Sequence, residues 1–529
     1  MLFNTYGFIL GFLPVVVIGF YLIGRLAGNR AAISSLVIAS LFFYGWWNPV
    51  YLLLIGTSIV VNYLLGLRLD PNVTHADPAQ EYAPRRSRLT LWLGIAFNLG
   101  LLGYFKYMNF FADTAAALLG ASFTLERIVL PLAISFFTFQ QITYLVDTSR
   151  GLAKKYSFLH YALFVTFFPQ LIAGPVVHHS EMMPQFMRND LCRFRFRNAA
   201  IGLTIFILGL FKKVVVADGI AVYGTPVFDA ASAGATLTFF EAWGGALAYT
   251  FQLYFDFSGY SDMAIGLARL FGIRLPLNFN SPYKATNIVE FWRRWHMTLS
   301  RFLRDYLYIP LGGNRKGPLR RQTNLMTTML LGGLWHGAGW TFVAWGGLHG
   351  LYLVVNHFWH GAKRRVFGEH TFGFAGCWGG RLLTFLVVII GWVFFRADSF
   401  EAATRILEGM TGLNGFLLPA GYRSLFGPLA EPLIAMGWRF EADGGYFYGS
   451  KQVMFTALLL WAIWALPNTQ EIMSRYRPAF ESIDFQPKSL LERLYNWRPT
   501  KGYASIIALV FTVCLLSLRR VSEFLYFQF

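Results

Sequence analysis

The chain has 529 residues, of which 55% are hydrophobic, 18% are aromatic and only 14% are charged. Because a soluble globular protein carries about 25% charged residues, this composition excludes an ordinary soluble domain and indicates a polytopic membrane protein. The net charge of +18 does not favour nucleic-acid binding, since the basic residues form short clusters between apolar segments, which is typical of cytoplasmic loops. The three cysteines have no paired spacing for a metal site or a disulfide framework.

Five apolar segments follow one another from the N-terminus, and they are near or above the roughly 20 residues that cross a bilayer. Basic residues follow the first, third and fifth of these segments, at 25–30, 68–88 and 150–155. The positive-inside rule therefore places these three loops in the cytoplasm and the N-terminus on the outer side.

Pro169, Gly174 and Pro175 interrupt the next apolar segment, 164–177. This pattern predicts a broken or re-entrant segment, which is tolerated only where the backbone is buried in protein or lines a cavity. No internal repeat is evident, which argues against a transporter built from repeated halves. The remaining apolar segments bring the expected total to about eleven spans, with two or more partial ones: 199–217, 236–255, 259–272, 324–335, 338–359, 381–395, 452–466 and 504–518.

Two adjacent histidines, His178 and His179, follow the broken segment. Neighbouring residues point in different directions in a helix or a strand, and the sequence indicates no companion acid nearby. We therefore predict no metal site here, and none elsewhere in the chain.

Asp256 and Asp262 lie six residues apart beside an apolar segment. They would suit an acid–base pair or a metal site, but an unpaired buried charge is expensive. The favoured interpretation is that each carboxylate bonds to an arginine, a tyrosine or a helix terminus inside the bundle.

Residues 288–321 predict a basic helix followed by a glycine-rich loop. Trp292, His296 and Leu299 share one face of this helix by their i, i+4 and i+7 spacing, whereas arginines occupy another face. Such an amphipathic helix lies at the membrane surface. Two interpretations stay open: anchoring to anionic lipid, or binding of a phosphorylated donor, to which loop 312–317 would present backbone N–H groups.

His336 lies within an apolar run that extends from residue 325 to residue 345. An ionisable side chain in hydrocarbon is costly, so it normally faces a bundle interior or a wet cavity and has a function there. Glycines at 332, 333, 337 and 339 would let a substrate approach the ring closely. A neutral imidazole suits general-base catalysis at cellular pH, but for His296 the alternative is a hydrogen-bonded core residue.

Two later regions complete the predicted organisation. His349, His357 and His360 recur near helical spacing, and we expect them at a helix end or an interface. The interval 398–450 is the longest without an apolar segment and is poor in basic residues, which predicts an external loop.

Seven segments carry a combined pattern that is more specific than any one histidine: 168–176, 256–262, 291–296, 304–308, 311–317, 330–340 and 466–471. Together they resemble the membrane-bound O-acyltransferase family, and most closely its bacterial branch, typified by the alginate O-acetyltransferase membrane subunit and relatives that act on cellulose and other polymers. Alanyl-transferring relatives that modify teichoic acid share the Phe-Trp-x-x-Trp-His pattern at 291–296. They differ at 308–316, which favours the acetyl-transferring branch.

The resemblance implies an all-α polytopic fold around a central tunnel, with the buried His336 midway along the tunnel. It implies one domain over 1–529 in the bacterial inner membrane, with a periplasmic N-terminus. The expected parts are N-terminal spans at 1–127, a catalytic core at 128–396, an external loop at 397–451 and C-terminal spans at 452–529.

The resemblance also implies an O-acetyltransferase that moves an acetyl group from cytoplasmic acetyl-CoA to an exported, alginate- or cellulose-like polysaccharide. His336 would be the general base, or a nucleophile that forms an acyl-histidine. His296, the second family histidine, would orient the acyl group or donate a hydrogen bond to the oxyanion. The expected donor-binding residues are Trp292, Trp295, Arg304, Asn314, Arg315, Lys316 and Trp335.

No cofactor is expected beyond acetyl-CoA as donor substrate. The chain has no Gly-x-Ser-x-Gly elbow, so periplasmic partners of the SGNH-hydrolase-like type are expected to complete transfer to the sugar. The alternatives are an acyltransferase directed at lipid or protein, and a non-enzymatic channel or exporter in which His336 gates passage or relays protons.

Overall fold

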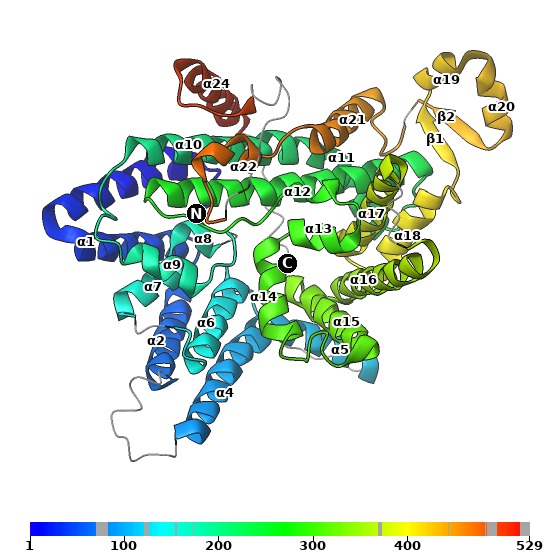
Figure 1. Cartoon of the computed structure of the whole chain (residues 1–529). Coiled ribbons are helices and arrows are strands. Elements are labelled where there is room, and N and C mark those ends of the chain that lie inside the picture. The colour runs from blue at the N-terminus through cyan, green and yellow to red at the C-terminus, as the bar shows by residue number, and fades with distance from the viewer. Residues whose placement is uncertain are drawn as a thin grey trace. The chain divides into compact units, whose positions relative to one another are not determined.

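The computed structural model describes residues 1–69, 83–120, 126–153, 156–172, 174–368, 373–442, 444–481, 483 and 495–518. Helices dominate these residues, and a pair of short strands forms the only sheet among them (Figure 1). The predicted all-α class of a polytopic membrane protein is confirmed. Within the predicted cytoplasmic loops, residues 70–82 and 154–155 lie outside the described residues.

The chain forms two compact units, each made from separate stretches of sequence. Unit 1 takes the described residues of Met1–Phe211, Tyr260–Leu277 and Thr469–Val521, and unit 2 takes those of Lys212–Gly259 and Asn278–Asn468. The long helix α12 (Phe239–Leu270) contributes to both. The predicted boundaries at 127, 396 and 451 stay predictions.

Unit 1 contains most of the N-terminal helices; here η denotes a π- or 3-10-helical segment. Its further elements are η1 (Gly7–Phe12), α1 (Leu13–Gly45), α2 (Tyr51–Leu69), α4 (Ala83–Leu102), η2 (Gly103–Tyr107), α5 (Met108–Leu119), α6 (Ile134–Ser149), α7 (Phe158–Thr166), α8 (Phe168–Leu171), α9 (His179–Phe186), α10 (Phe196–Phe211), α22 (Thr469–Ile472), η7 (Ser474–Tyr476) and α24 (Lys501–Ser517).

Unit 2 contains the segments that carry the predicted catalytic residues. Its further elements are η3 (Lys212–Ala217), α11 (Asp218–Ser232), η4 (Pro282–Lys284), α13 (Ile288–Arg294), α14 (Met297–Leu303), η5 (Arg304–Tyr308), α15 (Gly317–His336), α16 (Trp340–Phe367), α17 (Gly373–Arg396), α18 (Phe400–Thr411), β1 (Phe416–Pro419), α19 (Gly421–Phe426), η6 (Gly427–Leu429), α20 (Ala430–Ala435), β2 (Trp438–Glu441) and α21 (Ser450–Ala465).

Five helical stretches among the described residues are long and apolar enough to cross a membrane: Gly7–Gly45, Tyr51–Leu69, Arg88–Leu119, Phe196–Ser232 and Gly373–Arg396. The first of them is interrupted at Gly28, whose φ of +83° lies outside the helical region. This break falls inside the predicted cytoplasmic loop 25–30. Helices α21 and α24 are shorter and also apolar, and the estimate of about eleven spans stays a prediction.

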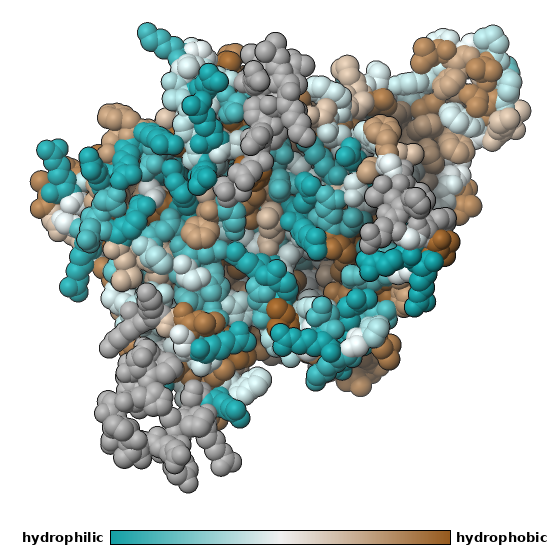
Figure 2. All heavy atoms as spheres, in the orientation of Figure 1, coloured by the Kyte–Doolittle hydropathy of each residue, from teal (hydrophilic) through white to brown (hydrophobic). Residues whose placement is uncertain are grey.

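Many large apolar side chains of the described residues are exposed, although the face drawn in Figure 2 is largely teal, with brown regions mainly toward its edges. On α1 alone, Val15 is 70% exposed, Ile18 is 65% exposed and Leu26 is 77% exposed. Large apolar patches are rare on the surface of soluble monomers. These side chains therefore suit contact with lipid.

The apolar segment 164–177 is broken, as its prolines and glycine predict. Helix α7 ends at Thr166, α8 makes a single turn that begins beside Pro169, and residues 172 and 174–178 are not helical. The buried Gln170 donates from Nε2 to the backbone oxygen of Phe164 at 2.6 Å. This hydrogen bond satisfies a carbonyl that the break would leave unpaired in a buried place.

The region predicted as an external loop is folded rather than irregular. It contains α18, α19, α20 and the parallel strands β1 and β2, in which Phe416 lies opposite Trp438. The carboxylate of Glu241 on α12 accepts a hydrogen bond from the backbone N–H of Tyr446 at 2.9 Å. Short strands with aromatic cross-strand pairs give little periodic signal in a sequence, which is why the region was expected to be a loop.

Candidate active site

His296 and His336 come together within unit 2. His336 is the last residue of α15, and His296 immediately precedes α14. Their ring centroids lie 6.1 Å apart, and only 7% of His336 and none of His296 is exposed. Two residues that are forty positions apart in sequence are thus neighbours in the buried interior of unit 2, and the side chains around their two rings are called the pocket below.

The helix predicted across Trp292 and His296 is not continuous, so that prediction is wrong. α13 ends at Arg294, Trp295 is extended, and His296 adopts φ +42°, a left-handed conformation. Asn278 compensates for the break, because its backbone oxygen accepts from the N–H of Met297 at 2.9 Å. A non-glycine residue in this conformation is strained by about 1–3 kcal/mol, which the surrounding contacts must offset.

Asn278 also sets the proton position on His296. The His296 Nδ1 lies 3.0 Å from the Asn278 side-chain oxygen, which can only accept, so Nδ1 carries the proton. The Nε2 atom is buried and has no hydrogen-bond partner among the described residues. Burial lowers the pKa of His296, so the ring is neutral and Nε2 offers a lone pair to the pocket.

Aromatic rings enclose His336. The ring centroids of Trp335, Trp345 and Phe395 lie 5.0, 5.1 and 5.3 Å from that of His336. On the other side of the pair, Phe257 of α12 meets His296 edge to face at 4.8 Å. These rings form an apolar wall that shields the two imidazoles from bulk water.

The glycines beside His336 do not open space for a substrate, contrary to the sequence-based expectation. A Cβ on Gly333 would meet the backbone oxygen of Phe342, and one on Gly337 would meet the Phe342 ring. A Cβ on Gly346 of α16 would meet the backbone oxygen of Met329. These glycines therefore allow α15 and α16 to approach each other closely, and this contact fixes the position of His336.

His349 is a third buried histidine, and the expectation that it lies at a helix end or interface is wrong. It is fully buried within α16, and its Nδ1 accepts a hydrogen bond from Nε1 of Trp292 at 3.3 Å. Trp345 stands between the histidines, with centroids 5.1 Å from His336 and 4.8 Å from His349. The signal was available in the sequence, because His349, like His336, is an ionisable residue in an apolar run.

The predicted donor-binding residues fall into two separate places. Trp292 binds His349, Trp295 packs on Trp392 with ring centroids 4.9 Å apart, and Trp335 contacts His336. Trp295 and Trp335 are buried, and Trp292 is partly buried against the same core. Their predicted role in donor binding stays a prediction.

The other predicted donor-binding residues lie on the surface. Asn314, Arg315 and Lys316 are exposed in the turn before α15. Arg304 donates from Nε to Asp305 at 2.6 Å, and this hydrogen bond raises the pKa of Arg304. Since α15 has 20 residues and rises 1.5 Å per residue, about 30 Å of helix separates this loop from His336.

Asp256 and Asp262 are each paired, as expected, but their partners are a lysine and a glutamine rather than an arginine, a tyrosine or a helix terminus. Asp256 contacts Nζ of Lys213 at 2.6 Å, and Lys213 also contacts Asp218 at 2.8 Å, with all three side chains buried. Asp262 accepts from Nε2 of Gln470 at 3.1 Å.

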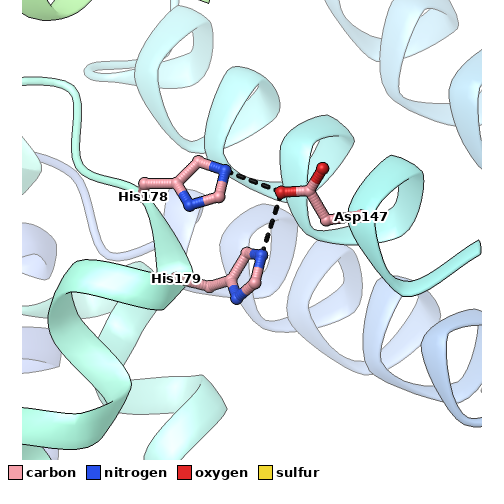
Figure 3. A group of neighbouring side chains, drawn as sticks. All are labelled: Asp147, His178 and His179. Carbon is pink, nitrogen blue, oxygen red and sulfur yellow. Dashed lines mark hydrogen bonds and ion pairs between the residues drawn. The ribbon is translucent and has the colours of Figure 1, made fainter. Parts of the chain in front are cut away.

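The expectation that His178 and His179 point apart is also wrong. Both Nε2 atoms contact Oδ2 of Asp147, at 2.7 Å for His178 and 3.0 Å for His179 (Figure 3). His178 has extended backbone as the N-cap of α9, and His179 begins the helix. The rule that adjacent residues diverge holds within a helix or strand and fails at this junction.

Comparison with known proteins gives a consistent result. Residues 86–395 match the model of the MBOAT, membrane-bound O-acyltransferase family. The peptidoglycan O-acetyltransferase of Helicobacter pylori is 48% identical over 444 residues, which are 79% of this chain and 81% of that protein. The probable alginate O-acetylase of Pseudomonas aeruginosa is 37% identical over 552 aligned positions that cover 100% of both chains. The teichoic acid D-alanyltransferase of Streptococcus thermophilus is 29% identical over 251 residues, 44% of this chain and 59% of that protein.

Proposed function

Because the chain belongs to the membrane-bound O-acyltransferase family, we propose that it passes acetyl groups from cytoplasmic acetyl-CoA across the membrane for O-acetylation of an exported polysaccharide. Family membership makes the chain a multi-pass membrane acyltransferase, so the non-enzymatic channel is set aside. The donor, the acceptor, the inner-membrane location with a periplasmic N-terminus and the role of each residue belong to the proposal.

The observation that carries the proposal is the buried pair of His296 and His336, with ring centroids 6.1 Å apart. His336 takes the proton of an acceptor hydroxyl while the hydroxyl oxygen attacks the thioester carbonyl. The new C–O bond forms, the C–S bond breaks, and the proton returns from His336 to the departing CoA sulfur. The aromatic wall keeps out water that would otherwise hydrolyse the thioester.

We assign His296 an accepting role rather than the oxyanion-donor role considered from the sequence. Its proton is on Nδ1, which is committed to Asn278. The Nε2 lone pair can therefore accept a hydrogen bond from a second hydroxyl of the acceptor, beside the one that loses its proton to His336, but it has no proton to donate to an oxyanion. A second route, a covalent acyl-histidine on His336, stays open beside general-base catalysis.

The exposed loop with Asn314, Arg315 and Lys316 is the proposed site for the phosphates of CoA. Cationic side chains and glycine-rich backbone suit anionic oxygens. Because about 30 Å of helix lies between this loop and His336, the two places suit an extended donor with phosphates at one end and a thioester at the other. The tryptophans of the pocket are proposed to enclose the acetyl group rather than to hold the nucleotide.

The acceptor is proposed to be a polysaccharide outside the cytoplasm. The similar proteins are named for peptidoglycan and for alginate, which are both carbohydrate polymers with free hydroxyl groups. The chain has no Gly-x-Ser-x-Gly elbow, so a periplasmic SGNH-hydrolase-like partner is proposed to complete transfer. An acyltransferase directed at lipid or protein remains the alternative.

The test supplies purified protein in lipid nanodiscs with acetyl-CoA labelled in the acetyl group, together with a candidate periplasmic partner. Peptidoglycan fragments, alginate and cellulose oligosaccharides are offered as acceptors, and palmitoyl-CoA replaces acetyl-CoA in a parallel series. Label in one carbohydrate, dependent on the partner, supports the proposal. Transfer only from palmitoyl-CoA, or label in lipid or protein, would select the alternative.

A further inference from the structure

Three potential metal ligands from two segments meet in unit 1 (Figure 3). Asp147 lies in the last turn of α6, and His178 and His179 lie at the start of α9. One carboxylate oxygen and one ring nitrogen from each histidine lie within 4.8 Å of one another. Asp147 is 3% exposed and His179 is 1% exposed, so this is not a chance encounter of surface side chains.

The local structure holds both imidazoles in this orientation. The backbone N–H of His178 donates to Glu181 at 3.0 Å, and the N–H of Ser180 donates to Nδ1 of His178 at 3.4 Å, which completes a capping box. Reciprocal hydrogen bonds of this kind fix the first turn of a helix. Both Nε2 atoms are thereby directed toward Asp147 before any ion binds.

The hydrogen bonds around the cluster suit a metal site. When Nε2 of His178 becomes a ligand, the neutral ring carries its proton on Nδ1, which lies 2.7 Å from the Ser180 hydroxyl oxygen and can donate to it instead of accepting from the Ser180 N–H. Metal-binding histidines usually donate their second ring N–H in this way. Arg150 approaches Asp147 only to 4.0 Å, with its own side chain 48% exposed, so it neutralises the buried carboxylate weakly.

We propose that Asp147, His178 and His179 bind one divalent transition-metal ion, with Zn²⁺ as the best match. Two imidazoles and one carboxylate with a free fourth position are a ligand set that zinc accepts in tetrahedral geometry. Ligand atoms of such a site lie about 3.3 Å apart for bonds of 2.0–2.1 Å. The Nε2 atoms of His178 and His179 lie 2.7 and 3.0 Å from Oδ2 of Asp147, so these separations need to widen by well under 1 Å.

An ion at this place would join the end of α6 to the start of α9. His178 has 24% of its side chain exposed, whereas the side chains of Asp147 and His179 are buried. We infer that an ion would reach the cluster past His178, the ligand with the largest exposed fraction. The site shares no residue with the pocket of His296 and His336, so the inference is independent of the proposed reaction.

The test measures metal content of the full-length protein, purified in detergent with a tag that contains no histidine. The protein is stripped with a chelator, incubated with one equivalent of Zn²⁺, desalted and analysed for zinc, iron, manganese and copper. We expect about one zinc per chain for the wild type, and at least about tenfold weaker retention for Asp147→Asn and His179→Gln. Substitution with Co²⁺ should give the visible absorption of a tetrahedral site.

His160→Gln is the matched control, since His160 lies in the same unit and bonds to Ser157 rather than to the cluster. It should retain zinc as the wild type does. If a buried variant fails to fold, the partly exposed His178→Asn, checked by gel filtration, replaces it. Wild-type protein that retains no more of any metal than Asp147→Asn or His178→Asn would overturn the proposal and leave a purely hydrogen-bonded cluster.

Discussion

At the residue scale, His296 depends on one upstream side chain. Asn278 accepts from Nδ1 of His296 at 3.0 Å and from the Thr298 hydroxyl at 2.9 Å. The same residue therefore holds the left-handed backbone and selects the tautomer that leaves Nε2 open. The orientation and tautomer of His296 are in this way set by a residue eighteen positions earlier.

This dependence gives a prediction for Asn278. Asn278→Leu removes the acceptor, leaves a buried N–H unpaired, and should cost about 1–3 kcal/mol of stability together with most of the activity. Asn278→Asp keeps the acceptor and should retain more activity. Because a nearby carboxylate raises the pKa of His296, and activity needs the neutral ring, the acid limb of its pH profile should move to higher pH.

The measurement is the rate of CoA release against pH for the wild type and both variants. Folding is checked independently by thermal denaturation in detergent. Equal rates for Asn278→Leu and the wild type would show that His296 orientation does not matter to the reaction.

A second prediction concerns the buried charges around Lys213. It contacts both Asp256 and Asp218, so Lys213→Met leaves two carboxylates without their cation and should cost about 3–5 kcal/mol. Lys212→Met, at the neighbouring and partly exposed position, is the control and should change stability far less. The melting temperature of each variant is measured in detergent. A Lys213→Met protein with the melting temperature of the wild type would refute a structural role for the cluster of Lys213, Asp218 and Asp256.

At the element scale, the close contact between α15 and α16 places His336. Gly333→Leu would drive a side chain into the backbone of Phe342, and overpacking of this kind costs about 1–3 kcal/mol. We expect a lower melting temperature and reduced CoA release. Gly347→Ala on α16 is the control, because its Cβ would make only an ordinary contact of 3.5 Å with Leu330. Equal loss in both variants would argue against this packing role.

Also at the element scale, the loop before α15 is separated from the histidines by the whole helix. Arg315→Gln combined with Lys316→Gln should raise the KM for acetyl-CoA several-fold and leave kcat nearly unchanged, since the loop is proposed to bind phosphates and not the acetyl group. Arg423→Gln, an exposed arginine paired with Glu431 at 2.7 Å, serves as control. A fall in kcat with constant KM would contradict a binding role.

At the scale of the whole molecule, the features that could be predicted from the sequence are those that depend on a few consecutive residues. Long apolar runs predicted the all-α membrane fold, the residues at 25–30 predicted the interruption at Gly28, and Pro169 predicted the broken segment. Each of these follows from the chemistry of a few consecutive residues. The two buried histidines of the pocket were also indicated by their own apolar surroundings.

What the sequence could not predict depends on residues far apart in the chain. The break at His296 needs Asn278, the convergence of His178 and His179 needs Asp147, and the role of Gly333 becomes clear only against Phe342. No periodicity or spacing connects these positions, because tertiary contacts set them. His349 is different, because its position in an apolar run already indicated a buried histidine, although we expected it at a helix end or an interface.

The most direct test of the central claim is the release of CoA from acetyl-CoA by the purified protein in lipid nanodiscs, supplied with the periplasmic partner and a carbohydrate acceptor. The wild type is compared with His336→Ala and with His360→Ala, whose histidine is exposed near the far end of α16. The account predicts that wild type and His360→Ala release CoA and that folded His336→Ala does so at least about 100-fold more slowly. Release by folded His336→Ala at the wild-type rate would contradict it.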